Sequence, residues 1–132
     1  MDNKCSILLV DDDKFLLEMY RKKFEESGAT VTVAVGSEEA LAQLREGTSF
    51  ELVVLDVIMP TMDGLELLAV IRKEGLASKA KIVMLTNESD PEKIQKAKAI
   101  GIDGYIVKAT RIPSEVVEET FKIANIKLNK SA

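Results

Sequence analysis

Short apolar runs alternate with longer amphipathic segments along the chain. The runs, which we predict to be strands, cover residues 5–10, 30–34, 51–55, 81–85 and 103–107. Three of them are almost unbroken Val, Ile and Leu, which is typical of strands that helices cover on both faces. Because helical segments separate the strands, the pattern predicts right-handed βαβ units around a parallel sheet.

The helical segments have apolar residues at helical spacing and polar residues at their ends. We predict helices over residues 14–27, 37–47, 64–74 and 90–100, and a last helix from about 113 that fades into 129–132. Ser37 is the predicted cap of the second helix, and Asp90, followed by Pro91, the cap of the fourth. Asp12 or Asp13 could cap the first helix in the same way.

Length and composition indicate one globular domain. The chain has 132 residues, of which 46% are hydrophobic and 30% charged, so neither a disordered nor a membrane protein is indicated. We expect the domain to cover residues 1–128, with a tail at 129–132. No apolar run approaches the ~18 residues of a membrane helix, and the amino terminus lacks a secretory leader pattern. The net charge of −4, with both signs spread along the chain, predicts no direct binding to nucleic acid.

The counts of cysteine and histidine exclude several kinds of site. Cys5 is the only cysteine, so the chain can form neither an internal disulfide nor a cysteine metal cluster. There is no histidine, which excludes imidazole zinc sites and phosphohistidine on this chain. Together with the missing leader pattern, the lone cysteine predicts a cytoplasmic protein without membrane contact.

Polar side chains of three kinds follow four of the five predicted strands. They are Asp11, Asp12 and Asp13 after the first, Asp56 after the third, Thr86 after the fourth and Lys108 after the fifth. In a parallel sheet these strand ends meet at one edge, where ligands bind. Crowded carboxylates need compensating cations, and oxygen ligands without His or Cys select hard ions such as Mg²⁺. A carboxylate can also receive a phosphoryl group, a transfer that depends on positioning and charge neutralisation.

Four segments together resemble the receiver domain of bacterial two-component response regulators. They are ILLVDDD at 7–13, LVVLDVIMPTMDGLELL at 52–68, IVMLT at 82–86 and GYIVK at 104–108. The resemblance extends from Ile7 to about Ile123, and its most specific part is 56–64. It implies an α/β fold of the flavodoxin-like (βα)5 type, a three-layer sandwich with a doubly wound, five-stranded parallel sheet of order 2-1-3-4-5.

The resemblance also implies a role for each site residue. Asp56 would be the phosphoacceptor, Thr86 would bond the phosphoryl group and Lys108 would pair with it. The Mg²⁺ set would be Asp11, Asp12, Asp56 and the backbone carbonyl of Ile58, with Asp12 a direct ligand and Asp11 acting through water. Thr86 and Tyr105 would form the switch, Tyr105 by changing its rotamer. No other cofactor is implied.

Taken one at a time, these residues have simpler interpretations. Thr86 could satisfy loop backbone groups, Lys108 could be solvated, and Tyr105 could belong to the core. All of these interpretations would have to hold together, which favours the functional one. Asp13 is assigned no direct role.

The implied function is a binding module controlled by phosphorylation, not an autonomous enzyme. Its partners would be a histidine kinase or phosphotransfer protein as donor and a downstream effector protein or domain. The alternative is a pseudo-receiver, an interaction scaffold that works without phosphorylation. A phosphatase is disfavoured because Ile58 stands where a second acid is usual, and nucleotide binding because the glycine-rich phosphate loops are missing.

Two departures from the family pattern follow Lys108. Ala109 stands where the family usually has a proline after a cis peptide, and residues 109–112 form a connection one residue longer than usual. A cis bond before a residue other than proline costs about 2.5–4 kcal/mol. The sequence therefore predicts either a trans peptide here or a strained cis one. The choice affects the direction in which the Lys108 side chain points.

Overall fold

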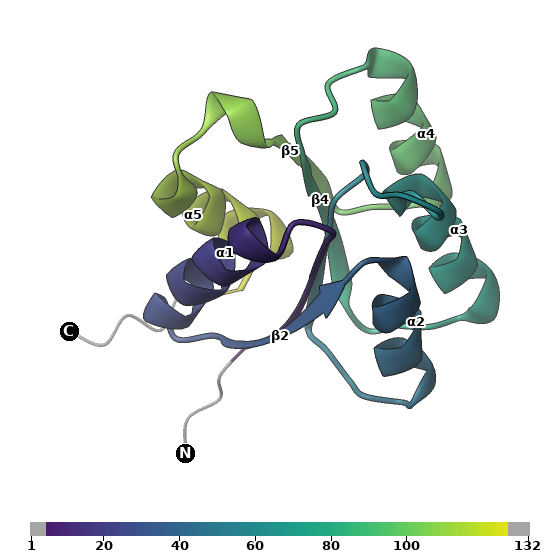
Figure 1. The fold of residues 1–132 in the computed structure, drawn as a ribbon, viewed down its shortest axis with the longest axis horizontal. Coiled ribbons are helices and arrows are strands. Elements are labelled where there is room, and N and C mark those ends of the chain that lie inside the picture. The colour runs from purple at the N-terminus through teal and green to yellow at the C-terminus, as the bar shows by residue number, and fades with distance from the viewer. Residues whose placement is uncertain (1–4, 127–132) are drawn as a thin grey trace.

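Five parallel strands form one sheet between two layers of helices (Figure 1). The computed structural model describes residues 5–126. The strands are β1 (Ser6–Asp11), β2 (Thr30–Val35), β3 (Leu52–Leu55), β4 (Lys81–Thr86) and β5 (Gly104–Val107). Their order is β2-β1-β3-β4-β5, and every neighbouring pair is parallel. The predicted fold class and strand order are confirmed.

The helices lie on both faces of the sheet. They are α1 (Lys14–Glu26), α2 (Ser37–Arg45), α3 (Gly64–Glu74), α4 (Pro91–Ile100) and α5 (Pro113–Ala124). Figure 1 shows α1 and α5 on one face and α2, α3 and α4 on the other. Because each face is covered, β1, β3 and β4 bury almost every side chain, which explains their unbroken apolar sequences.

Each layer has its own apolar core. Under α1 and α5, Phe24 and Phe121 meet edge to face, with ring centroids 5.7 Å apart. On the other face, Leu68 and Ile71 of α3 belong to one cluster with Met84 of β4, and all three are fully buried. These two cores fix the sheet from both sides and so hold the strand ends in place.

The helix caps agree with the sequence except at α2. Asp13, rather than Asp12, caps α1, because its Oδ1 accepts hydrogen bonds from the backbone N–H groups of the first turn. Asp90 caps α4 as predicted. The prediction for Ser37 is wrong: α2 begins at Ser37 and Gly36 is its cap residue. The Ser37 hydroxyl instead donates to the carbonyl of Met62, 2.8 Å away, and thereby connects the start of α2 to the loop after β3.

Several predicted boundaries shift by a few residues. β1 and β4 each extend one residue further, to Asp11 and Thr86, so these two site residues belong to the strands themselves. The last helix ends earlier than predicted, at Ala124, where Asn125 takes the left-handed conformation with φ 56°. The predicted domain end at 128 and the tail at 129–132 lie outside the described residues.

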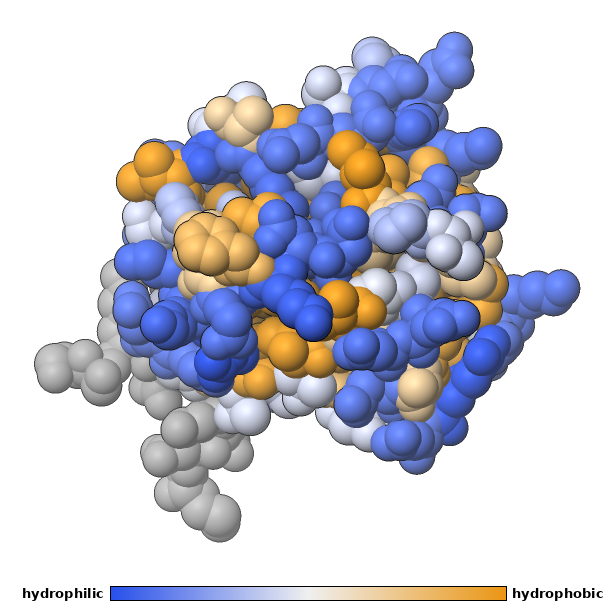
Figure 2. Space-filling view, in the orientation of Figure 1, coloured by the Kyte–Doolittle hydropathy of each residue, from blue (hydrophilic) through white to orange (hydrophobic). Residues whose placement is uncertain are grey.

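The surface is mainly hydrophilic, with separate hydrophobic patches on the face that Figure 2 shows. Within residues 5–126, no helix has both the length and the apolar character that crossing a membrane requires. Three large hydrophobic side chains are exposed in this part of the chain, and they are Phe15, Ile58 and Ile112. Each of the three follows the carboxyl end of a strand.

Candidate functional site

The carboxyl ends of four strands bring the predicted polar side chains together. Asp11 ends β1, Asp56 directly follows β3, Thr86 ends β4 and Lys108 directly follows β5. Parallel register aligns these ends, since Val10 lies beside Leu55 and Leu55 beside Met84. All four side chains are buried, although three of them are ionisable. Charges are buried in proteins only where they are paired, so their mutual geometry is decisive.

Lys108 lies between two carboxylates. Its Nζ is 2.6 Å from Oδ2 of Asp11 and 3.5 Å from Oδ2 of Asp56. Burial alone would lower the pKa of Lys108, but the hydrogen bond to Asp11 and the two negative charges outweigh burial and raise it. The lysine is therefore held as an ammonium ion at the centre of the site.

The connection after Lys108 reaches this geometry with a trans peptide. Within residues 5–126 no peptide bond is cis, so the bond between Lys108 and Ala109 is trans. Residues Lys108–Thr110 form a short 3₁₀ turn, which closes with a hydrogen bond from the Arg111 N–H to the Lys108 carbonyl. The Thr110 hydroxyl also donates to the Val107 carbonyl, 2.9 Å away. This turn aims the lysine into the site without the family's proline.

Burial and the contacts of Asp56 have opposite effects on its pKa. Burial raises the pKa of Asp56, and the charge of Asp11 adds to this effect. Hydrogen bonding from Thr86, the charge of Lys108 and the N–H of Ile58, 3.1 Å from Oδ1, act in the opposite direction. The net pKa is higher than that of an ordinary aspartate, because removal from water outweighs these contacts.

Gly64 holds the backbone of Asp56 in place by close approach. Its N–H donates to the Val57 carbonyl over 2.8 Å, and a Cβ added to Gly64 would lie 2.0 Å from the backbone oxygen of Asp56. A side chain at this position would therefore push the Asp56 backbone out of place. From the sequence, Gly64 is predicted only to begin a helix, although it belongs to the specific 56–64 segment.

Three carboxylates form a group that fits a divalent cation. Oxygens of Asp11, Asp12 and Asp56 all lie within 4.8 Å of one another. With Lys108 as the neighbouring cation, the group retains two uncompensated negative charges, and its ligands are all oxygen, as Mg²⁺ prefers. Partial removal from water, followed by a hydrogen bond with Asp11 and the charges of Asp11 and Asp13, raises the pKa of Asp12. The role of the Ile58 carbonyl as a ligand stays a prediction.

The predicted switch residues Thr86 and Tyr105 are joined through Glu88. The Glu88 N–H donates to the Thr86 hydroxyl oxygen over 3.2 Å, and the Tyr105 hydroxyl donates to the Glu88 carbonyl over 2.6 Å. Burial, followed by nearby carboxylates, raises the pKa of Tyr105 to about 12, so the hydroxyl keeps its proton and remains a donor. Glu88 could not be predicted from the sequence, because every residue type has the same backbone carbonyl.

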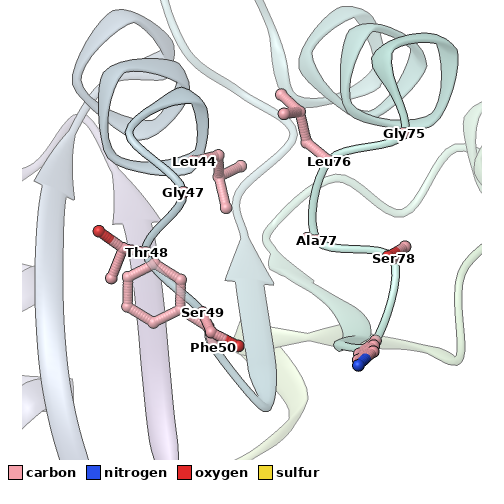
Figure 3. Close-up of a pocket in the computed structure, with 10 residues that line it drawn as sticks. Leu44, Gly47, Thr48, Ser49, Phe50, Gly75, Leu76, Ala77 and Ser78 are labelled. Carbon is pink, nitrogen blue, oxygen red and sulfur yellow. The ribbon is translucent and has the colours of Figure 1, made fainter.

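A separate hollow lies at the other end of the sheet (Figure 3). It is formed by the connections that lead from α2 into β3 and from α3 into β4, and is lined by apolar residues such as Leu44, Phe50 and Leu76. Its lining contains no carboxylate. Among the described residues, the buried charged side chains are Asp11, Asp56 and Lys108, all at the carboxyl ends of the strands, and the hollow lies away from them.

The chain is similar to known receiver domains and response regulators. Residues 7–119 match the family model of the response regulator receiver domain. The chain is 35% identical over 108 residues to the chemotaxis protein CheY of Halobacterium salinarum, which covers 82% of this chain and 88% of that protein. It is 33% identical over 128 residues to the two-component response regulator ARR10 of Arabidopsis thaliana, which covers 95% of this chain. The chain spans only 23% of that longer protein.

Solved structures agree with these relatives. The Vibrio cholerae chemotaxis protein CheY4 superposes with a TM-score of 0.82 at 31% identity, covering 91% of this chain and 98% of that one. A CheY-like response regulator receiver domain protein from Methanospirillum hungatei gives a TM-score of 0.83 at 29% identity, over 93% of this chain and 95% of that one. The chain therefore belongs to the family of response regulator receiver domains of two-component signalling.

Proposed function

We propose that the chain accepts a phosphoryl group on Asp56 in a Mg²⁺-dependent reaction, and that this changes its affinity for a partner. The observation that carries the proposal is the position of Lys108. Its ammonium group contacts the carboxylates of both Asp11 and Asp56 in the buried site, although Ala109 replaces the usual proline. A scaffold that never met a phosphoryl group would have no need to bury two acids and a lysine at one edge.

The transfer forms one bond and breaks one. An oxygen of the ionised Asp56 attacks the phosphorus of a phosphohistidine on the donor, and the nitrogen–phosphorus bond breaks with its electron pair left on the donor ring. If that ring is protonated, it leaves as neutral imidazole. Lys108 and Thr86 then contact the oxygens of the new acyl phosphate, which carries roughly −1.5 to −2 charges on the pattern of phosphate esters.

A bound Mg²⁺, held by Asp11, Asp12, Asp56 and the carbonyl of Ile58, would neutralise charge on the phosphoryl oxygens. The chain's own residues position Asp56 for the reaction. Gly64 keeps the Asp56 backbone in position, and the Ile58 N–H orients one carboxylate oxygen and so leaves the other for attack. Because the chain itself keeps the product, we propose an acceptor and not a catalyst with turnover.

We propose a histidine kinase or phosphotransfer protein as the donor. Phe15 is 79% exposed, Ile112 61% and Ile58 53%, and all three follow strands that end at the site. We propose that these three side chains give the donor apolar contacts beside the site. The other partner is an effector protein or domain that binds the modified form. We place the exchange in the cytoplasm and propose no direct contact with nucleic acid.

The proposal is tested by intact-mass measurement after incubation with acetyl phosphate and Mg²⁺. We expect the mass of one phosphoryl group to be added, and the addition to disappear in the Asp56→Asn variant or when the metal is chelated. Ser89→Ala, an exposed change in the nearby loop, is the matched control and should be modified normally. If the wild type gains no mass and binds no fluoroberyllate, the proposal is wrong and the scaffold alternative is favoured.

A further inference from the structure

Glu88 forms hydrogen bonds through its N–H, its carbonyl and its carboxylate. Its N–H reaches the Thr86 hydroxyl and its carbonyl accepts from the Tyr105 hydroxyl. Its carboxylate accepts from the Asp90 N–H over 3.1 Å and from Nζ of Lys93 over 3.0 Å. Glu88 thus connects the end of β4, Tyr105 of β5 and the first turns of α4.

Lys93 is the one member of this network that no function described above uses. It lies on α4, where its side chain is 45% exposed, while that of Glu88 is only 20% exposed. The ion pair with Lys93 lowers the pKa of Glu88, and the pair together with the charges of Asp63 and Asp90 raises that of Lys93. Both groups are therefore fully charged at neutral pH, and the pair persists there.

The ion pair constrains the backbone of Glu88 as well as its side chain. The carboxylate is held on the α4 side by Lys93 and the Asp90 N–H, while the carbonyl of the same residue faces Tyr105. If the carboxylate is released, rotation about the Glu88 backbone becomes easier and the carbonyl loses its fixed direction. The hydrogen bond from Tyr105 then has a less well-placed acceptor.

We propose that Lys93 is a positioning residue that acts through Glu88 to hold the Tyr105 hydroxyl in its hydrogen bond before any phosphorylation. Lys93 thereby sets the balance between the bonded and the released states of Tyr105. Resting on the proposed function, the inference has a second part: phosphorylation at Asp56 acts on the same balance through Thr86, whose hydroxyl oxygen accepts from the Glu88 N–H.

Fluorine NMR of protein labelled with 3-fluorotyrosine measures this balance. The chain has two tyrosines, and Tyr20, a buried residue of α1, serves as an internal reference. The variants are Lys93→Gln, which removes the ion pair, and Lys98→Gln as matched control. Lys98 is an exposed lysine of the same helix, and no carboxylate of the described residues forms an ion pair with it. The spectra are recorded without any phosphodonor.

We expect the Tyr105 resonance to move towards the position of a free tyrosine in Lys93→Gln, with the ratio of bonded to released states falling about 1.4- to 5-fold. The Tyr20 resonance should not move, and Lys98→Gln should match the wild type. Lys93→Glu should move Tyr105 further, and the swap Glu88→Lys with Lys93→Glu should return it towards the wild-type position. A Tyr105 resonance that stays in place in Lys93→Gln, or moves equally in Lys98→Gln, overturns the proposal.

The second part has its own readout. Because coupling is reciprocal, Lys93→Gln should change the affinity for fluoroberyllate with Mg²⁺ by a factor similar to its effect on Tyr105. An unchanged affinity overturns the link to the phosphoryl site but leaves the positioning role of Lys93 in place. If the wild type takes up no phosphoryl group and no fluoroberyllate, the proposed function fails, while the fluorotyrosine comparison still decides the role of Lys93.

Discussion

Replacing Lys108 with methionine should destabilise the protein strongly. The ammonium group lies 2.6 Å from Asp11 and 3.5 Å from Asp56. At an effective dielectric constant of about 20, these distances correspond to attractions of roughly 6 and 5 kcal/mol. Burying an ammonium ion costs several kcal/mol, which offsets much of this sum, and removing one partner of a buried pair typically costs about 3–5 kcal/mol. We therefore expect Lys108→Met to lower the free energy of unfolding by about 3–5 kcal/mol.

Urea unfolding followed by circular dichroism, with and without Mg²⁺, measures this loss. In the variant the two acids lack a cation, so Mg²⁺ should raise the free energy of unfolding more in Lys108→Met than in the wild type. Lys122→Met, a change at an exposed lysine of α5, is the control and should alter stability by less than about 0.5 kcal/mol. A loss below about 1 kcal/mol, or an equal Mg²⁺ effect in both proteins, would show that Lys108 does not compensate the charges of the buried acids.

A double variant separates the lost attraction from the buried charge left behind. Asp11→Asn combined with Lys108→Met removes both members of the closest pair, so less uncompensated charge stays in the site. The double variant should therefore be more stable than Lys108→Met alone. If it is less stable than the single variant by the full cost of Asp11→Asn, the two residues do not interact and the charge argument fails.

Three further predictions concern the loop after β3 and the acids. Gly64→Ala should lower the free energy of unfolding by about 1–3 kcal/mol and slow phosphorylation from acetyl phosphate, because its Cβ would meet the Asp56 backbone oxygen. A normal rate of phosphorylation would contradict the close approach of Gly64 to Asp56. Thr61 has φ 69°, which is strained for a β-branched residue, so Thr61→Gly should stabilise the protein by about 1 kcal/mol in urea unfolding; a loss of stability would show that the conformation is unstrained. The raised pKa values of Asp12 and Asp56 mean that the folded protein takes up protons at a pH where the unfolded chain is still ionised. On acidification, proton uptake by these two acids should therefore favour the folded state. The affinity for Mg²⁺, measured by calorimetry, should begin to fall at a pH above 3.8, the ordinary pKa of aspartate. An affinity that stays constant down to pH 3.8 would contradict the raised pKa values.

The sequence predicted the layout of the site because two simple rules sufficed. Apolar runs that alternate with helical segments specify a parallel sheet, and in such a sheet the residues after the runs share one edge. As a result, Nζ of Lys108 and Oδ2 of Asp56 lie 3.5 Å apart at that edge. The strand order, in contrast, came from the family resemblance, because the apolar pattern alone allows several orders.

Loop geometry is what the sequence did not reveal. Ser37 has the residue type of a helix cap, yet its hydroxyl bonds a carbonyl of another loop. Glu88 connects the switch residues mainly through its backbone, and backbone groups are the same in every residue type. The trans peptide before Ala109 was one of two predicted outcomes, and the choice between them depended on how the 3₁₀ turn closes. The bonds of Ser37 and Tyr105 join segments far apart in the periodic pattern, and the 3₁₀ turn closes through local backbone bonds that residue type does not specify.

The most direct test of the account is to locate the phosphoryl group on the chain. After reaction with acetyl phosphate and Mg²⁺, borohydride reduces an aspartyl phosphate to homoserine, and peptide mass spectrometry identifies the converted residue. We predict homoserine at Asp56 alone, dependent on Mg²⁺ and strongly reduced in Thr86→Val. Conversion of Asp11 or Asp12 instead, or uptake that persists in Asp56→Asn, would contradict the assignment of Asp56 as the phosphoacceptor.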